Sequence, residues 1–515
     1  MLVFERNVMK RIYLVLLSVG FLTLTMGGCK NYLDEQLLGN YSDGTFYKTQ
    51  AQAILAINAA YTPLTFSSDR NRLWVFGDVA SDDAAKGGDP GDQADIGLID
   101  DFQVYPSNGP VESQWGEMYE GIYRCNQILA RVPAINMNAT VQSRILGEAR
   151  FLRALYYFYL VNIYGPIPLL LEPKNADQLQ IPQSPVATIY EQAIEPDLQE
   201  AIKNLPAAYT GSDVGRATKG AATALLAKAY LYEKKWQLAA TTAAQVQAIG
   251  NYSLLPVYAQ NFDQAHKNNA ESVFAVQHLT GQVPFTGNRL NQWFAPRANE
   301  NGYFFNAPTA GFVNEFEKTS TGVVDPRLDY TVGRAGKNWV NGQPFDPAWS
   351  PTGYLTKKHE QPLSEIPSST KGDGNLNYVA IRYADVLLWQ AEALNELGRS
   401  AEALPLLNQV RKRARESYLN DPTLSAPGSG TTASTVPVGL LPDVTTTSQS
   451  SLRDAIYHER RVELGQEFHR FFDLMRWGKD YAQNALRDKT SFKYDTNRYF
   501  PIPQSERDTN KALKF

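Results

Sequence analysis

The sequence contains few of the residues that build disulfide frameworks and metal sites. It has two cysteines, Cys29 and Cys125, and five histidines among 515 residues. A single cysteine pair cannot form the disulfide network of a small secreted domain, and no cysteine–histidine group has the spacing of a zinc site. Cys125 lies inside a helical pattern, which predicts a small buried side chain. We therefore expect no structural metal and no disulfide.

An excess of basic residues is also absent. The formal net charge is −4 at pH 7, and a nucleic-acid-binding protein needs a basic surface that releases counterions from the phosphates. Phosphate-binding motifs are lacking too, because Lys86-Gly87-Gly88 and Gly211–Gly215 have no flanking strand and helix. The Gly-x-Ser-x-Gly motif of a nucleophilic serine does not occur either. These absences argue against a nucleic-acid partner, and no motif points to a particular catalytic activity.

Long apolar runs are missing except near the start of the chain. Residues 12–26 are apolar, follow the basic residues of 9–11 and precede two glycines and Cys29. About fifteen residues are fewer than the ~20 that cross a bilayer, and this arrangement resembles a bacterial lipobox. It predicts a lipoprotein signal peptide over 1–28, a lipid anchor on Cys29 and a tether over 29–45. Stable attachment then requires two or more acyl chains on the cysteine.

A plain secretory cleavage site and a membrane-spanning anchor are the alternatives for this segment. The true start codon, Met1 or Met9, stays undecided.

Helical periodicity is what the sequence has in abundance, over about 46–250 and 378–480. In 141–164 the apolar residues recur every three or four positions until Gly165-Pro166. Two stretches, 226–239 and 391–403, have the spacing of large and small residues in a tetratricopeptide (TPR) helix pair. The predicted fold class is all-α dominated.

Three further features complete the predicted organisation. Residues 250–378 are rich in glycine, proline, asparagine and aromatics, and predict an irregular insertion. Residues 421–450 have low complexity and predict an exposed loop. A last long helix is predicted to start at Ser451 and to run through Phe468 and Met475. His458 and His469 then share one face of it, as parts of an ion-paired surface.

Aromatic residues in loop-like sequence are the candidate ligand contacts. Four tryptophans, Trp115, Trp236, Trp389 and Trp477, lie in helical patterns, where core packing is the expected role. Flat aromatic faces beside polar side chains suit sugar rings, whose C–H faces stack while their hydroxyls form hydrogen bonds. The alternative is that these rings only hold the loops together. The candidates are Trp74, Trp293, Tyr303, Phe304, Trp339, Trp349 and Tyr354.

Several blocks of the sequence resemble the SusD/RagB family, the surface lipoproteins of Bacteroidetes nutrient-uptake systems. The acidic pair Asp34-Glu35 after Cys29 is similar to that family's surface-export signal. The longer blocks occur in the family's usual order: WGEMYEGIYRCNQIL (115–129), GEARFLRALYYFYLVNIYGPIPLL (147–170), IRYADVLLWQAEALNELG (381–398), YHERRVELGQEFHRFFDLMRWG (457–478) and YFPIPQSERDTN (499–510).

This resemblance implies a fold, a place and a partner. It implies a single domain over 46–515, with four TPR-like helix pairs as scaffold and an irregular ligand-facing half. It implies a lipid-anchored protein on the outer-membrane surface that captures oligosaccharides for a SusC-like TonB-dependent transporter, without catalysis and without a cofactor.

Three other functions stay open at this point. The same scaffold binds peptides in some branches of the family. A surface hydrolase would use acids such as Asp82, and a purely structural TPR adaptor would bind the transporter alone. A calcium site at the acidic pairs Asp82-Asp83 and Asp100-Asp101 is also open, because hard cations take clustered oxygen ligands.

Overall fold

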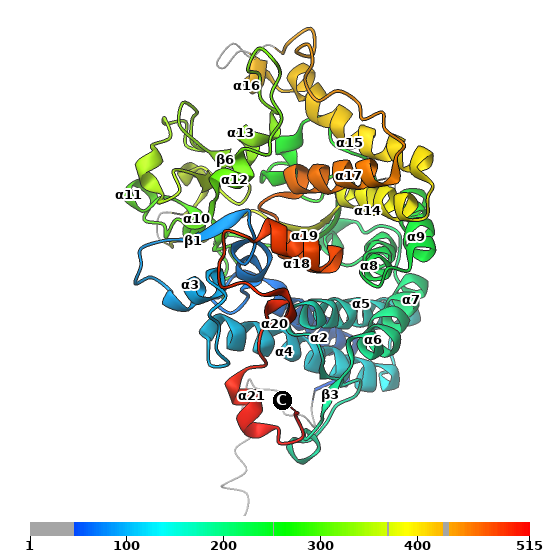
Figure 1. Cartoon of the computed structure of the whole chain (residues 1–515). Coiled ribbons are helices and arrows are strands. Elements are labelled where there is room, and N and C mark those ends of the chain that lie inside the picture. The colour runs from blue at the N-terminus through cyan, green and yellow to red at the C-terminus, as the bar shows by residue number, and fades with distance from the viewer. Residues whose placement is uncertain (1–45, 251, 368–369, 426–431, 515) are drawn as a thin grey trace, which may run out of the picture. The chain divides into compact units, whose positions relative to one another are not determined.

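Long helices form from two stretches of the sequence that flank the irregular region (Figure 1). Their boundaries follow local signals. The side chain of Asn138 accepts hydrogen bonds from the backbone at the start of one helix, and Gly165 ends it with φ of 74°. The long helices are α2 (Gln50–Tyr61), α4 (Gly109–Arg131), α5 (Ala139–Tyr164), α7 (Glu195–Asn204), α8 (Lys219–Tyr232), α9 (Trp236–Gly250), α14 (Tyr383–Glu396), α15 (Ser400–Asn420) and α17 (Gln449–Leu464).

The computed structural model describes residues 46–514 apart from positions 251, 368–369 and 426–431. Residues 1–49 and 50–515 are two separate units, and the second carries the fold discussed below. The predicted signal peptide, the tether and the lipid anchor Cys29 lie outside the described residues. None of the helices in the described part is long and apolar enough to cross a membrane.

The helices pack as antiparallel neighbours. α4 packs against α5, α8 against α9 and α14 against α15, while α9 and α14 join two pairs that are distant in the sequence. The small residues of the TPR-like spacing, such as Ala227, Ala391 and Ala403, are fully buried. Gly398 turns the chain between α14 and α15 with φ of 76°. The all-α-dominated fold class is therefore confirmed, and the helix pairs are consistent with TPR-like units.

The prediction of one long helix from Ser451 onward was wrong. α17 ends at Leu464, and a separate helix, α18 (Arg470–Trp477), follows. The chain turns at Gly465, where a Cβ would lie 2.2 Å from the Phe312 ring. His458 and His469 consequently do not share a helix face, since His469 stands at the N-terminal cap of α18.

Small antiparallel sheets hold the irregular region onto the helices. β1 (Ala84–Gly87) pairs with β5 (Phe305–Pro308), and β4 (Ser272–Val276) pairs with β8 (Tyr378–Arg382). β2 (Ile167–Pro168) pairs with β3 (Gln183–Ser184), and β6 (Val332–Gly333) with β7 (Leu355–Thr356). Within the described residues no sheet has more than two strands. This region is therefore held by side chains more than by extended backbone pairing.

The predicted low-complexity loop is partly buried. Leu440 and Leu441 pack against Ala414 of α15, with 3% and 1% of their surface exposed. A four-residue helix, α16 (Pro422–Ser425), opens the segment.

A buried ionic network connects α17 with the irregular region. Glu463 accepts hydrogen bonds from Arg327 at 3.0 Å, from Arg382 at 3.0 Å and from Arg413. Burial alone would raise the pKa of Glu463, but the three guanidinium groups hold it well below its usual value. Glu459, Glu467 and Glu271 pair with the same arginines. The charged block 457–478 thus forms part of the core.

Candidate ligand-binding face

An aromatic ladder runs from the surface of the irregular region into the core. The rings of Tyr303 and Phe305 are parallel, with centroids 5.6 Å apart and an interplanar angle of 7°. Phe305 stacks on Trp74 at 5.8 Å, and Trp74 contacts Trp293 at 5.9 Å. Tyr303 is half-buried, while Trp74 is fully buried. The surface ring is therefore backed by a continuous stack that keeps it in place.

The interpretation of Trp74 and Trp293 as loop aromatics is corrected by the structure. Trp74 lies in a helical turn that leads into the π-helix Val75–Val79, and Trp293 belongs to α10 (Leu290–Phe294). Trp74 is 0% exposed and Trp293 5% exposed. Neighbouring rings cover the indole of Trp74 completely, so it offers no face to a ligand.

A second cluster brings three other candidates together. Trp339, Phe345 and Leu355 are buried, and Phe304 and Trp349 pack against them while staying half-buried. The Trp349 ring lies edge-on to Trp339, with centroids 6.5 Å apart.

Tyr354 packs elsewhere, against the cluster of Phe312 and Phe316. The candidates with surface-facing rings in one region are thus Tyr303, Phe304 and Trp349, which we call the aromatic edge.

Arg297 covers the aromatic edge from one side. Its guanidinium carbon lies 5.5 Å from the centroid of the Tyr303 ring and 5.6 Å from that of Phe304. The same group pairs with Asp89 at 3.3 Å and with Asp92. The charge is therefore fixed beside the two rings instead of pointing freely into solvent.

The backbone beneath the aromatic edge is strained. Asn301, Phe304 and Asn306 all have positive φ, at 54°, 43° and 54°. A bulky aromatic residue in this region costs of order 1–3 kcal/mol and persists only when the surroundings enforce it. Here the close packing of β1 enforces it. Gly87 has no Cβ, so the strand can approach the carbonyl oxygen of Phe304, which would lie 2.1 Å from a Cβ at that position. The strain turns consecutive side chains, Phe304 and Phe305, into two different clusters.

A cavity of about 250 Å³ opens next to the aromatic edge. The backbone N–H groups of Tyr303 and Phe304 donate to the carbonyls of Gln292 and Ala295, which both line it. These two hydrogen bonds thus attach the aromatic edge to α10 and the residue that follows it, which also form part of the cavity wall. The lining residues are Asn291, Gln292, Ala295, Glu300, Leu363, Ile366, Pro367, Lys371 and Gly372.

Glu300, at the end of α11 (Arg297–Glu300), links the cavity to the aromatic cluster. Its Oε1 accepts hydrogen bonds from Trp339 Nε1 at 2.7 Å and from Asn341 Nδ2 at 2.6 Å. Asn341 Oδ1 in turn accepts from the backbone N–H of Leu363 at 2.7 Å. Burial raises the pKa of Glu300, and these hydrogen bonds oppose the shift. The polar residues of the cavity carry no sequence pattern, and sequence reasoning missed them.

The acidic pairs considered for calcium or catalysis are engaged in ion pairs. Asp82 accepts from Arg470 at 2.8 Å and pairs with Arg461 at 2.8 Å, and Asp83 pairs with Arg461 at 2.7 Å. Asp100 pairs with Lys489. The described residues contain no group of three or more histidine, cysteine or acidic side chains that could hold a metal ion. Asp82 is therefore placed as a structural ion-pair partner.

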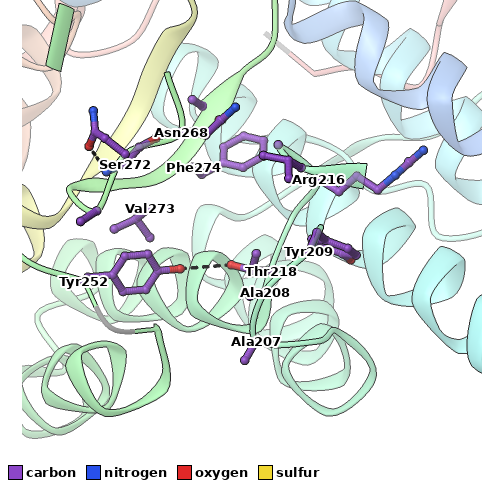
Figure 2. Close-up of a pocket in the computed structure, with 15 residues that line it drawn as sticks. Ala207, Ala208, Tyr209, Arg216, Thr218, Tyr252, Asn268, Ser272, Val273 and Phe274 are labelled. Carbon is purple, nitrogen blue, oxygen red and sulfur yellow. Dashed lines mark hydrogen bonds between the residues drawn. The ribbon is translucent and has the colours of Figure 1, made fainter. Parts of the chain in front are cut away.

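A second cavity, of about 230 Å³, lies between the loop before α8 and strand β4 (Figure 2). Its polar groups are used within the protein. The hydroxyl of Tyr252 is 3.2 Å from Thr218 Oγ1, and Tyr209 donates to the carbonyl of Ala217. Arg216 pairs with Glu148 and Asp213. A cavity whose polar side chains already have partners has less to offer a polar ligand than one with unused hydrogen-bonding groups.

Comparison with known proteins gives matches along nearly the whole chain. The family described as "SusD family" matches residues 270–514, and the family described as "Starch-binding associating with outer membrane" matches residues 41–231. A SusD-like protein of Formosa agariphila is 27% identical over 96% of each chain. A SusD-like protein of Bacteroides ovatus is 26% identical over 90% of this chain and 82% of its own.

Matches to solved structures also cover most of the chain. A laminarin-binding SusD-like protein is 29% identical, with a TM-score of 0.73 over 91% of this chain and 99% of its own. A SusD superfamily protein of Bacteroides vulgatus is 26% identical, with a TM-score of 0.76 over the same shares.

Proposed function

We propose that this chain, which belongs to the SusD/RagB family, captures oligosaccharides at the outer-membrane surface and delivers them to a SusC-like TonB-dependent transporter. It does so as a binding protein, without turnover. The observation that supports this most directly is the aromatic edge of Tyr303, Phe304 and Trp349, set beside a cavity with polar side chains.

The physical basis is the shape of a sugar ring. Its C–H face is apolar and stacks on an aromatic face, and its hydroxyls need fixed donors and acceptors around the rim. Tyr303 is backed by Phe305 and Trp74, so little rotamer freedom is lost when a ligand stacks on it. The polar groups of Asn291, Gln292 and Glu300 lie next to it.

The relatives indicate which ligands to test first. The solved relative with 29% identity is described as laminarin-binding, so laminari-oligosaccharides head the panel. One matching family is described as associating with the outer membrane. The attachment proposed here is a lipid on Cys29, and the expected evidence is incorporation of labelled palmitate that is lost in Cys29→Ser.

Titration calorimetry on the chain without residues 1–29 tests the binding function. The panel contains laminari-, cello-, xylo- and chito-oligosaccharides and mixed peptides. We expect saturable heat with one glycan class, and at least a tenfold weaker affinity in Tyr303→Ala and Trp349→Ala. Tyr123→Ala is the matched control, because Tyr123 is 52% exposed on helix α4 of the scaffold.

Each other outcome assigns a different function. Heat from peptides alone would move the protein to peptide capture. The absence of binding heat with every ligand would favour an adaptor that binds only the transporter. An equal loss in Tyr123→Ala and Tyr303→Ala would place the site away from the aromatic edge.

A further inference from the structure

Asn291 is a buried side chain with unused hydrogen-bonding capacity. It is 3% exposed, and neither its Nδ2 nor its Oδ1 has a hydrogen-bond partner among the described residues. Leaving both ends of a buried carboxamide unpaired is costly, because the group has given up its hydrogen bonds to water. Asn291 lines the cavity beside the aromatic edge. It therefore brings an unpaired amide nitrogen and an unpaired amide oxygen to the wall of that cavity.

Aliphatic side chains form much of the rest of the cavity wall, beside the polar side chains of Gln292, Glu300 and Lys371. Leu363, Ile366, Pro367 and Ala295 line it, and no aromatic ring does so among the described residues. A pyranose ring prefers the flat face of an aromatic side chain, whereas a wall of aliphatic carbons suits a methyl group. At about 250 Å³ the cavity is also smaller than the usual site for a whole drug-sized ligand. It has the size of a subsite for one part of a longer ligand.

Glu300 supplies a second acceptor at the same cavity. Both of its hydrogen bonds, from Trp339 and from Asn341, end on Oε1. Oε2 remains an acceptor without a partner among the described residues. These two hydrogen bonds also fix the carboxylate in position, so a donor on the ligand meets a preorganised group.

We propose that this cavity binds the acetamido group of an N-acetylated amino sugar. The acetamido carbonyl accepts a hydrogen bond from Asn291 Nδ2. Its N–H points away from the carbonyl, as in any trans amide, and donates to Glu300, while its methyl group packs on Leu363 and Ile366. The sugar ring that carries the group lies toward the aromatic edge. This inference rests on the proposed glycan-binding function and specifies its ligand as an oligosaccharide that contains N-acetylhexosamine.

Two ligands with the same backbone and different substituents test the inference. N,N′,N″-Triacetylchitotriose, called chitotriose here, and cellotriose are both β-1,4-linked and differ in having acetamido or hydroxyl groups at carbon 2. We expect the chain without residues 1–29 to bind chitotriose at least tenfold more tightly than cellotriose. Partly deacetylated chitotriose should lose most of that preference.

Three variants test whether Asn291 and Leu363 cause the preference for the acetylated ligand. Asn291→Ala and Asn291→Asp should lower the affinity for chitotriose at least tenfold more than they lower the affinity for cellotriose. Leu363→Ala, at a side chain that is 45% exposed, should reduce the same preference by a smaller factor, about threefold. Unfolding temperatures and near-ultraviolet circular dichroism show which variants keep the fold, and Leu363→Ala remains informative if both Asn291 variants unfold.

The outcomes distinguish a failure of the acetamido subsite from a failure of the proposed glycan-binding function. Equal affinity for chitotriose and cellotriose in the wild type would overturn it, as would an equal loss of both ligands in Asn291→Ala. If laminari- or cello-oligosaccharides bind in a Tyr303-dependent way without any acetyl preference, the glycan-binding function stands and the acetamido subsite fails. If no glycan binds, both fail.

Discussion

The helical scaffold and the irregular region satisfy their polar groups in different ways. In α5 the backbone hydrogen bonds are internal to the helix, and buried polar side chains such as Arg153 are fully paired, here with Asp197 and Asn126. The irregular region leaves Asn291 unpaired, and Glu360, which is 4% exposed, has no partner for either carboxylate oxygen among the described residues. The scaffold also contains buried atoms without a hydrogen-bond partner, for example on Glu148 and Asp385, but among the described residues only Asn291 and Glu360 have both end atoms of a buried carboxamide or carboxylate without one.

The two regions are also held together by different forces. Aromatic stacking and a few hydrogen bonds hold the irregular region around Tyr303 and Trp339. Besides the small sheets, one connection to the scaffold is ionic, through Arg327 on one side and Glu463 on the other. A buried ion pair adds little net stability but is costly to break, because the remaining partner keeps its charge in a low-dielectric interior. This joint is thus sensitive to the loss of one partner.

The largest effect is expected from Glu463→Ala. This change leaves the buried guanidinium groups of Arg327, Arg382 and Arg413 without their shared carboxylate. We expect the free energy of unfolding to fall by about 3–5 kcal/mol, measured by urea denaturation followed by circular dichroism. Glu402→Ala is the control, since its pair with Arg399 is exposed on the surface and its loss should leave stability nearly unchanged. Similar effects of the two changes would contradict a buried joint.

Counted per side chain, the effect of acidification comes next in size, and it acts through two histidines of the irregular region. Burial lowers the pKa of His278 and of His359 to about 4. The unfolded chain takes up these protons near pH 6.5, whereas the folded chain does so only near pH 4. Their contribution to stability is therefore complete above pH 6.5 and is lost as the pH falls to 4, by roughly 3 kcal/mol for each histidine.

Unfolding curves at pH 7, 6, 5 and 4 measure this loss. The double variant His278→Gln/His359→Gln should have a shallower pH dependence than wild type over that window, and the difference between the two slopes isolates the histidines from the buried acids. Parallel curves would show that neither imidazole is kept neutral by the fold.

The same difference explains what could be predicted from the sequence. The helix over 141–164 was predicted almost to its ends, because its apolar spacing and the terminal Gly165-Pro166 are local signals. The break after Leu464 could not be predicted, since it depends on the contact between Gly465 and Phe312, which are far apart in the sequence. Periodic segments carry their structure locally, and irregular ones do not.

For the candidate site, composition points to a region and not to single residues. The aromatic richness of 250–378 suggests candidates that include Tyr303, Phe304 and Trp349, and the structure places Phe304 and Trp349 in one cluster and Tyr303 on the stack with Phe305. It could not show that Trp74 is fully buried, because exposure depends on which rings cover it. Asn291 and Glu300 had no distinguishing pattern, since an asparagine or glutamate in irregular sequence is usually solvated.

A moderate local effect is expected from Gly88→Ala. A Cβ there would lie 2.4 Å from the Phe305 ring, and φ is already 67°. Gly342 has φ of 83° with no described atom within 4 Å of the same position, so Gly342→Ala reports the backbone strain alone. We expect Gly88→Ala to destabilise the region around β1 and β5 by about 2 kcal/mol more than Gly342→Ala does. Hydrogen exchange should show faster exchange in these strands and unchanged protection in α5.

The smallest effect on stability, and the sharpest contrast between the regions, is expected from Arg297→Ala. Its side chain is 43% exposed, and its pairs with Asp89 and Asp92 are on the surface. The free energy of unfolding should therefore change by less than about 1 kcal/mol. The rings of Tyr303 and Phe304 lose the cation that lies beside them, and glycan affinity should fall three- to tenfold. Arg399→Ala, an exposed pair on the scaffold, should leave affinity unchanged. A scaffold tolerates the loss of a surface charge without consequence, whereas a binding face does not. An unchanged affinity in Arg297→Ala would mean that the charge only ties down the loop around Asp89.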